Sequence, residues 1–401
     1  MVFARHSKGE LRRSTLHVGM LSLRRRRHVR NLMLCAVCIS AVATFMGDVF
    51  YRVTSVHVPG SSSGPNARIV GRGDEHFLAT WQAEDVLFIE PFHGLGNRLR
   101  AYASAAALAK KSGRSLVVVW IPDVHLGANF TDLFEVPAGV VVFHFPILSS
   151  LLQNNHRLLT YDYNSEGGKD EILRDRSRSA IYVRSAYVLQ SETKVIEGDI
   201  VEELKALKPV TSVTRRARQG SAHLAGLEDV IGVHIRMQTD LDRDVPGISK
   251  LPSYHAAGTA SMGPYKHHRS RCHYNEFIPK LTQALKENHE TVFLVSTDSH
   301  EAVDALRKVF GQRVQTLRGK RPDCSGVLAR SASCVQEALA QFLALSQVSS
   351  SFILSEWSSS SELIQRLGSP TPYTFGCAQE KMSRLSPAHL TWLVHRFVST
   401  D

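Results

Sequence analysis

The chain has 401 residues, of which 43% are hydrophobic and 21% are charged, a composition typical of a folded protein of about two domains and not of a disordered chain. Its formal net charge of +11 would suit nucleic-acid binding if the charge were spread over the folded part. Residues 1–30 hold nine Lys or Arg and one acid, a charge of +8, which leaves +3 for all the rest. A nucleic-acid partner is therefore not expected.

An apolar stretch follows this basic segment. Residues 31–47 contain no charged side chain; Asp48 interrupts the stretch, and Val49-Phe50-Tyr51 ends it. Its length is near the lower limit for crossing a bilayer. Because the arginines precede it, the positive-inside rule predicts a cytosolic N-terminus and a lumenal body. A cleaved signal peptide is the alternative, since Ala41-Val42-Ala43 has the form of a cleavage site, but the long basic tail favours an uncleaved anchor at 31–51. A short span suits the thin early secretory membranes, so we expect a single-pass type II protein of the Golgi or endoplasmic reticulum membrane.

The remaining chain divides by composition into a stem, two domains and a tail. Residues 52–82 are rich in Gly, Ser and Pro and indicate a flexible stem. The expected organisation is a basic cytoplasmic tail (1–30), an anchor (31–51), the stem (52–82), an N-terminal Rossmann-like domain (83–215), a C-terminal Rossmann-like domain (216–375) and a C-terminal helical tail (376–401).

The first domain opens with a strand–turn–helix–strand unit. An apolar run at 86–89, a turn with Gly94 and Gly96, a helix at 97–111 and an apolar run at 116–120 are typical of a parallel α/β sheet. Backbone N–H groups of the glycine turn could meet an anion at the helix start. Position 99 is Leu, so the turn does not fit Gly-x-Gly-x-x-Gly and a dinucleotide site is disfavoured. The other elements expected in this domain are strands at 140–145 and 180–183 and a helix at 199–207.

The second domain is expected to begin with the strand 229–236. A polar loop at 237–273 exceeds the usual loop length, which favours a functional role. Helices and strands then alternate, which predicts a second parallel sheet with helices on both faces. The expected helices are 275–288, 299–310, 335–344 and 359–367, and the expected strands are 291–296, 313–317 and 351–354.

Polar clusters follow three of these strands. They are His234-Ile235-Arg236, Ser296-Thr297-Asp298 and Ser355 to Glu362. Ligands of doubly wound sheets bind at the carboxyl ends of strands, where an Arg can clamp a diphosphate and a Ser-rich helix start can bind an anion. Helix capping explains each of the last two clusters taken singly. Three clusters at successive strand ends together favour a binding site.

Four cysteines lie beyond the apolar stretch. Cys272, Cys324, Cys334 and Cys377 could form two bridges in an oxidising lumen, in any of three pairings. None has Cys-x-x-Cys spacing, so a structural zinc site is not expected. The sequon Asn129-Phe130-Thr131 suits a lumenal loop.

The clusters, in this order, resemble the fucosyltransferase superfamily that includes protein O-fucosyltransferases, α1,6-fucosyltransferases and the bacterial nodulation fucosyltransferases. The matching pieces are Gly94-Leu95-Gly96-Asn97-Arg98, His234-Ile235-Arg236, Ser296-Thr297-Asp298 and Ser355 to Glu362. The resemblance implies an α/β fold of two facing Rossmann-like domains of the GT-B type and inverting transfer of fucose from GDP-fucose. It also implies that no metal or other cofactor is required.

The resemblance implies a role for each matching residue. Arg236 would stabilise the leaving diphosphate, and His234 with Asp298 would hold the nucleotide. Gly94, Gly96, Asn97 and Arg98 would reach the donor from the first domain. Contacts to the phosphates would come from Ser358, Ser359 and Ser360.

Departures from the family pattern leave other functions open. Ser360 stands where many members have Phe, and the loop 237–273 matches no known acceptor region. Asp240 and Asp242 are candidates for the general base by loop position alone. A transferase of the same fold with another nucleotide sugar remains an alternative, as does an inactive glycan-binding or scaffold protein. The expected partners are a nucleotide-sugar donor, a glycan or protein acceptor, and the membrane through 31–51.

Overall fold

The computed structural model describes residues 68–70, 85–154, 157–163, 172, 177–237, 272–324 and 326–377. The expected cytoplasmic tail, the anchor at 31–51, most of the stem and the helical tail lie outside these residues, as does most of the loop 237–273. In the part of the chain that is described, no helix is both long and apolar enough to cross a membrane. Two parallel sheets dominate this part, and both belong to one compact unit, residues 63–401.

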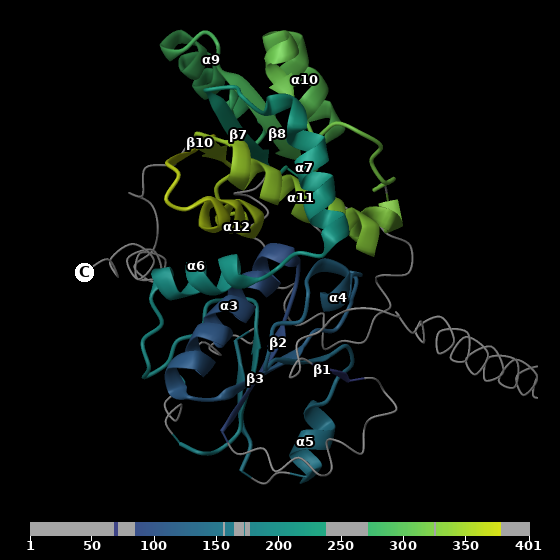
Figure 1. Ribbon diagram of the computed structural model, residues 1–401, viewed down its shortest axis with the longest axis vertical. Coiled ribbons are helices and arrows are strands. Elements are labelled where there is room, and N and C mark those ends of the chain that lie inside the picture. The colour runs from purple at the N-terminus through teal and green to yellow at the C-terminus, as the bar shows by residue number, and fades with distance from the viewer. Residues whose placement is uncertain are drawn as a thin grey trace, which may run out of the picture. The chain divides into compact units, whose positions relative to one another are not determined.

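The first sheet has six parallel strands in the order β1-β4-β3-β2-β6-β5. Figure 1 labels β1, β2 and β3 of this sheet. β1 lies at one edge, beside β4; the chain then continues at β2 near the middle, with β3 and β4 on one side of β2 and β6 and β5 on the other. Every side chain of β2 is buried, as expected for a strand covered on both faces. The strands are β1 (Arg68–Val70), β2 (Val86–Pro91), β3 (Ser115–Val119), β4 (Val141–Phe143), β5 (Leu159–Asp162) and β6 (Ile181–Ser185).

The helix that follows β2 is the central helix of this half. It is α3 (Leu95–Ser112), and most of its first fifteen residues are buried because its many alanines let it pack closely between the sheet and other helices. Lys110 and Lys111 lie in its last turn, where positive charge complements the helix dipole, and Gly113 ends it with φ 71°. The expected helix is confirmed, but it begins two residues before Asn97 because Gly94 already accepts the first helical hydrogen bond, from the N–H of Arg98 at 3.1 Å. The other helices of this half are α4 (Phe130–Leu133), α5 (Leu148–Asn154) and α6 (Glu197–Ala206).

The second sheet has five parallel strands in the order β11-β10-β7-β8-β9. It also starts near the middle, at β7, and grows toward β9 on one side and β11 on the other. The expected alternation of strands and helices is confirmed. The strands are β7 (Val230–Ile235), β8 (Val292–Thr297), β9 (Val314–Gln315), β10 (Ser351–Leu354) and β11 (Tyr373–Phe375).

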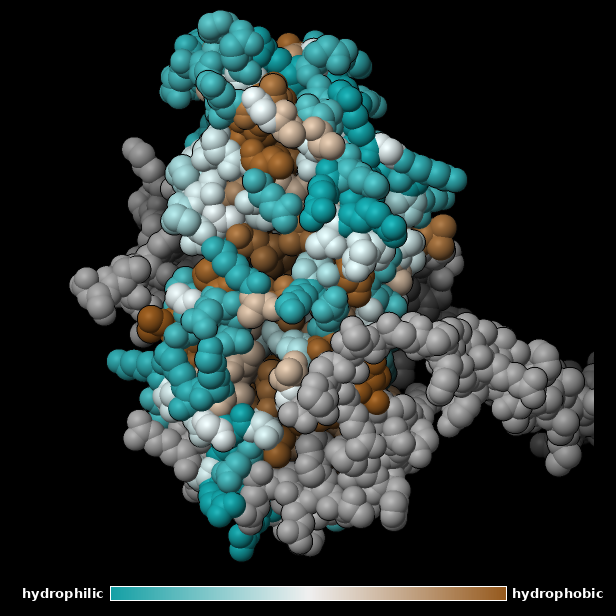
Figure 2. All heavy atoms as spheres, in the orientation of Figure 1, coloured by the Kyte–Doolittle hydropathy of each residue, from teal (hydrophilic) through white to brown (hydrophobic). Residues whose placement is uncertain are grey.

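Helices surround this second sheet. α9 and α10 bury their apolar positions, such as Leu281 and Leu306, and carry the hydrophilic residues seen over them in Figure 2. The helices are α7 (Thr211–Ser221), α9 (Ile278–Glu287), α10 (His300–Phe310), α11 (Ala332–Val348) and α12 (Ser359–Gly368), with short 3-10 turns at Ala222–Leu224, Tyr274–Glu276, Gly311–Arg313 and Gly326–Arg330.

The sequence did not predict α7, and the boundary expected between residues 215 and 216 falls inside it. Its buried positions are Val213, Ala217, Gly220 and Ser221, so its inner face offers little apolar signal. It packs on α11, where Arg216 forms two hydrogen bonds to Glu337, at 2.7 and 2.8 Å. Packing against α11 therefore stabilises a helix that its own pattern does not indicate.

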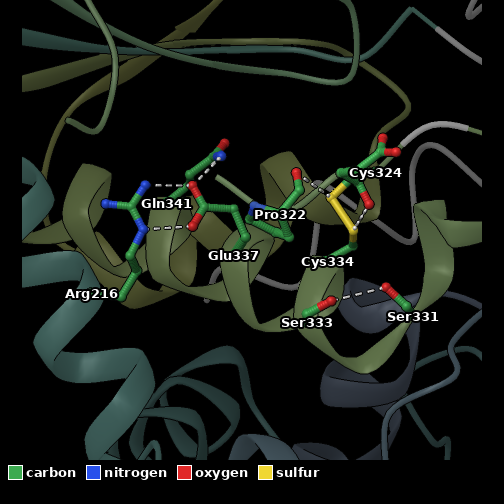
Figure 3. The surroundings of a disulfide bond; sticks show 9 residues. Arg216, Pro322, Cys324, Ser331, Ser333, Cys334, Glu337 and Gln341 are labelled. Carbon is green, nitrogen blue, oxygen red and sulfur yellow. Dashed lines mark hydrogen bonds and ion pairs between the residues drawn. A yellow bond between two sulfur atoms is a disulfide. The ribbon is translucent and has the colours of Figure 1, made fainter. Parts of the chain in front are cut away.

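Two disulfides resolve the pairing that the sequence leaves open. Cys272 pairs with Cys377, and Cys324 pairs with Cys334. The second bridge ties the segment before α11 to the first turn of that helix, three residues before Glu337, the partner of Arg216 (Figure 3). The first bridge joins Cys272, where the described chain resumes after the polar loop, to Cys377, the second residue after β11.

The two halves meet through the N-terminal turns of α3 and α12. A Cβ atom at Gly96 would overlap the backbone carbonyl of Ser359 and lie 2.9 Å from the N atom of Ser360. Only glycine allows two helix starts to approach this closely. Beside this contact, Arg100 of α3 pairs with Glu362 of α12 at 2.8 Å, and Glu362 pairs with Arg366 at 2.7 Å.

Gly96→Ala should therefore destabilise the protein by about 1–3 kcal/mol, because the added methyl group has to push two backbones apart. The matched control is Gly94→Ala, since a Cβ at Gly94 meets nothing within 4 Å and its φ of −72° is open to alanine. The control should cost less than about 1 kcal/mol, as a helix N-cap change does. Chemical denaturation of both variants measures the difference, and equal stabilities would contradict this contact.

Candidate active site

The central strand of the second sheet, β7, lies at the point where the strand order reverses. β8 is its neighbour on one side and β10 on the other. In open parallel sheets the carboxyl ends of the strands at such a switch point border a crevice where ligands bind. The three polar clusters expected from the sequence follow β7, β8 and β10, and the register brings their ends together.

Arg236 and Asp298 form the centre of this site. Nη1 of Arg236 lies 2.9 Å from Oδ2 of Asp298, and both side chains are largely buried. The Asp298 carboxylate also accepts a hydrogen bond from the N–H of Met237 at 3.0 Å, and the N–H of Arg236 donates to Oγ of Ser355 at 2.8 Å. These contacts tie the ends of all three strands and orient the guanidinium of Arg236.

His234 lies beneath this site and is buried. Its Nδ1 atom is 2.8 Å from Oγ of Ser361 in α12, and its ring meets the Phe342 ring edge-on at 5.6 Å. Burial, reinforced by the charge of Arg236, lowers the pKa of His234 to about 3, so the imidazole is neutral near pH 7. In this position it supports the start of α12, and its expected contact with a nucleotide stays a prediction.

Ser358, Ser359 and Ser360 form the start of α12. Ser358 is the N-cap, and its Oγ accepts a hydrogen bond from the N–H of Ser361 at 3.3 Å. Ser358 is buried, while Ser359 and Ser360 are partly exposed. The first turn thus presents backbone N–H groups and hydroxyls together, the arrangement that binds anions at helix N-termini.

The glycine turn of the first half faces this helix start. Gly94 is the N-cap of α3, Gly96 touches the backbone of Ser359, and Asn97 is partly exposed in the first turn. The structure therefore brings two helix N-termini to one place, which concentrates the positive ends of two helix dipoles. The sequence had assigned both segments to one site but could not establish their contact.

Both helix starts are preceded by a residue in the left-handed region. His93, before Gly94, has φ 64°, and Trp357, before Ser358, has φ 58°. Non-glycine residues adopt this conformation at a cost, and such residues cluster at binding sites and switch regions. Neither residue was singled out from the sequence, because no local pattern marks a left-handed His or Trp.

Arg98 is a structural residue in this arrangement. It is 1% exposed, donates to the carbonyls of His93 at 2.8 Å and Ile121 at 2.7 Å, and pairs with Asp123 at 2.9 Å. These contacts fasten the glycine turn to the segment after β3. Its expected contact with the donor stays a prediction, but each of these three bonds is to the protein itself.

A polar chain that the sequence did not reveal supports the end of β8. Oγ of Ser296 donates to Oε1 of Gln341 at 2.8 Å, and Gln341 donates to Glu337 at 3.2 Å. Glu337 in turn accepts both hydrogen bonds from Arg216 (Figure 3). The chain runs from α7 through α11 to the strand that carries Asp298, and its members are too far apart in sequence to form a recognisable motif.

The two acidic residues expected to act as a general base, Asp240 and Asp242, lie outside the described residues. Among the residues that are described, no group of three or more His, Cys, Asp or Glu side chains could hold a metal ion. The expectation that the reaction needs no metal stays a prediction. The described site therefore offers one oriented guanidinium and two converging helix starts, a combination suited to binding a negatively charged group and stabilising charge that develops on it.

The buried, neutral His234 predicts a specific pH dependence of stability. The unfolded chain takes up a proton at an ordinary histidine pKa of about 6.5, whereas the folded protein does so near 3, so its stability falls as the pH drops between these values. At pH 5 this loss is on the order of 2 kcal/mol. His234→Gln should reduce the difference in unfolding free energy between pH 7 and pH 5 by on the order of 2 kcal/mol, while partly buried His144, whose pKa burial lowers to about 4, keeps its own contribution. The control is His289→Gln, at a histidine that is 87% exposed, and an unchanged pH dependence in His234→Gln would contradict the assignment.

Comparisons with known proteins give matches among solved structures. No protein-family model and no curated protein sequence matches the chain. The fucosyltransferase NodZ from Bradyrhizobium matches with 17% identity and a TM-score of 0.46, over 70% of this chain and 92% of that one. NodZ α1,6-fucosyltransferase soaked with GDP-fucose matches with 16% identity and a TM-score of 0.44, over 71% and 92%. POFUT1 in complex with GDP matches with 14% identity and a TM-score of 0.43, over 73% and 98%.

These are proteins of the kind that the sequence motifs resemble. At such low identity the side chains of a site do not transfer from one chain to another, so the function of this chain rests on its own residues.

Proposed function

We propose that this chain is an inverting glycosyltransferase that transfers fucose from GDP-fucose to a hydroxyl group of a glycan or protein. The main supporting observation is that Arg236 and Asp298 pair where the strand order of the second sheet reverses, next to the serine-rich start of α12. The glycine turn of α3 adds a second helix N-terminus from the other half. The motif order that resembles fucosyltransferases supports fucose and guanosine diphosphate as the donor groups.

The chemistry of transfer fits these groups. As the bond between the sugar and the diphosphate breaks, negative charge develops on the leaving diphosphate. The guanidinium of Arg236 and the N–H groups of the first turn of α12 would stabilise that charge, and because they are fixed before the reaction they need no reorganisation. Asp240 and Asp242 remain the candidates for accepting the proton of the attacking hydroxyl, and the resemblance implies a reaction without a metal cofactor.

Arg236→Ala should lower the release of GDP from GDP-fucose by about 10²–10³-fold, the effect of removing one preorganised donor to developing charge. Arg218→Ala is the matched control, because it removes the same charge from an exposed position of α7. Turnover is measured with the full chain, a mixed glycan acceptor and labelled GDP-fucose. Full turnover in Arg236→Ala would exclude the proposed role.

Competition between donors distinguishes fucosyl transfer from transfer of another sugar. GDP-fucose should displace bound GDP at lower concentration than UDP- or ADP-sugars do. Preference for a UDP- or ADP-sugar would mean that the protein is a transferase with another donor. Binding of a donor without any turnover would favour the glycan-binding alternative.

The proposed setting is the lumenal side of the Golgi or endoplasmic reticulum membrane, with residues 31–51 as the anchor. The charge-free stretch behind a basic tail supports it. In cells, the full chain should stay with membranes after alkaline carbonate extraction, and a chain shortened to residues 53–401 and given a cleavable leader should not. Extraction of the full chain into the soluble fraction would contradict the anchor. Loss of an N-glycan on Asn129→Gln would add evidence for a lumenal body.

A further inference from the structure

A polar cavity lies in the first half, and of the residues expected to bind the donor only Arg98 lines it. The first sheet reverses its strand order between β2 and β6, just as the second does between β7 and β10. The carboxyl ends of β2 and β6 therefore border a crevice of their own. A cavity of about 160 Å³ opens there, and its lining holds both polar and apolar side chains: Glu90, Arg98, Asp123 and Arg184, and Pro91, Phe92, Ile121, Pro146 and Leu148.

Glu90 is the residue that makes this cavity unusual. It is the fifth residue of β2, where a parallel strand is normally apolar, and its side chain is 9% exposed. The hydroxyl of Tyr182 donates to its Oε2 at 2.5 Å, and Nε of Arg184 lies 3.5 Å from the same oxygen. Among the described residues no donor reaches Oε1, so one oxygen of a nearly buried carboxylate is left to a ligand in the cavity.

Neighbouring strands hold this carboxylate in place. Glu90 and Arg184 are paired in the register of β2 and β6, and Arg184 and Asp162 are paired in the register of β6 and β5. Arg184 contacts Asp162 at 3.2 Å, and its guanidinium stacks over the Phe92 ring at 4.6 Å. Burial raises the pKa of Glu90, although the charge of Arg184 and the hydrogen bond from Tyr182 oppose this effect. A buried acid that is held by fixed partners at a strand end and has a perturbed pKa is a candidate for a ligand site.

The balance of charges identifies the class of ligand. Two arginines and two acids line the cavity, so its formal charge is zero. A charged ligand would leave an uncompensated charge in a largely buried place, which is costly. A neutral molecule that carries both hydroxyl and C–H groups matches the polar and the apolar side chains of the lining. The volume equals about five water molecules of 30 Å³, on the order of one monosaccharide ring.

We propose that this cavity binds one neutral sugar residue, with a sugar hydroxyl donating to Oε1 of Glu90, a second hydroxyl near Arg184, and the C–H face of the ring against Phe92. Taken with the proposed function, on which this part rests, the bound residue belongs to the acceptor. The cavity borders the β2–α3 turn, and that turn leads into the helix start that meets α12. Glu90 is then a residue that selects the acceptor.

Direct binding tests the cavity without the donor. Methyl glycosides of glucose, galactose, mannose, N-acetylglucosamine and fucose are titrated into the full chain in a detergent without sugar groups, and binding is followed by saturation-transfer NMR. At least one should bind at millimolar concentration, and methyl glucuronide should bind more weakly than methyl glucoside. Glu90→Gln, which keeps the shape but removes the charge, should weaken binding about tenfold. Phe92→Ala should also weaken it, while GDP binding stays unchanged in both variants.

The matched control is Glu202→Gln, at an exposed glutamate of α6, which should bind the glycosides like the unchanged protein. Phe92→Ala serves as the second test if Glu90→Gln does not fold. Equal glycoside binding by the protein and its folded cavity variants would overturn the proposal, and so would failure of every glycoside to bind. Since this measurement needs no GDP-fucose, a failed donor reaction leaves its result intact.

Steady-state kinetics of the active protein test whether the bound sugar belongs to the acceptor. Glu90→Gln should raise the KM for the acceptor about tenfold and leave the KM for GDP-fucose unchanged. An equal rise for both substrates, or a fall in kcat alone, would overturn the assignment of the bound sugar to the acceptor.

Discussion

The close contact between Gly96 and Ser359 is the constraint on which the arrangement of the site depends. It sets the first turn of α3 against the first turn of α12, so that two helices from different sheets begin at one place. No side chain larger than hydrogen fits at Gly96, and the ion pairs from Arg100 to Glu362 and on to Arg366 hold the two helices beside it. A weaker contact would separate the helix starts, and their partial positive charges would no longer act on one anion.

Polar contacts hold each side of this junction firmly. On one side Arg98 ties the glycine turn to the segment after β3, and on the other Ser355 and Asp298 tie the end of β7 to both of its neighbours. Most of these groups are buried, so each bond is strong and each unpaired group would be costly. Such rigidity is what a site needs when it must stabilise charge during a reaction rather than adapt to it.

The two sheets share one architectural rule but carry different chemistry at their switch points. The second presents Arg236 beside a helix start, which suits an anion. The first presents Glu90 in a cavity of zero formal charge, which suits neutral hydroxyl groups. A protein that joins a charged donor to a neutral acceptor requires both kinds of site, and the turn between Pro91 and Gly96 connects them.

The sequence by itself determined the parallel α/β class, the order of most strands and helices, and the three clusters at the strand ends, because each depends on local apolar patterns and on residues next to one another in the chain. It did not determine α7, whose buried face consists of small residues, or the disulfide pairing, for which three arrangements were equally consistent. Nor could it reveal that Arg98 is satisfied by protein carbonyls and Asp123, or that Glu90 lies beside Arg184 and Tyr182. Apart from the bond from Arg98 to His93, these depend on contacts between residues 10 to 121 positions apart, which strand register and helix packing decide.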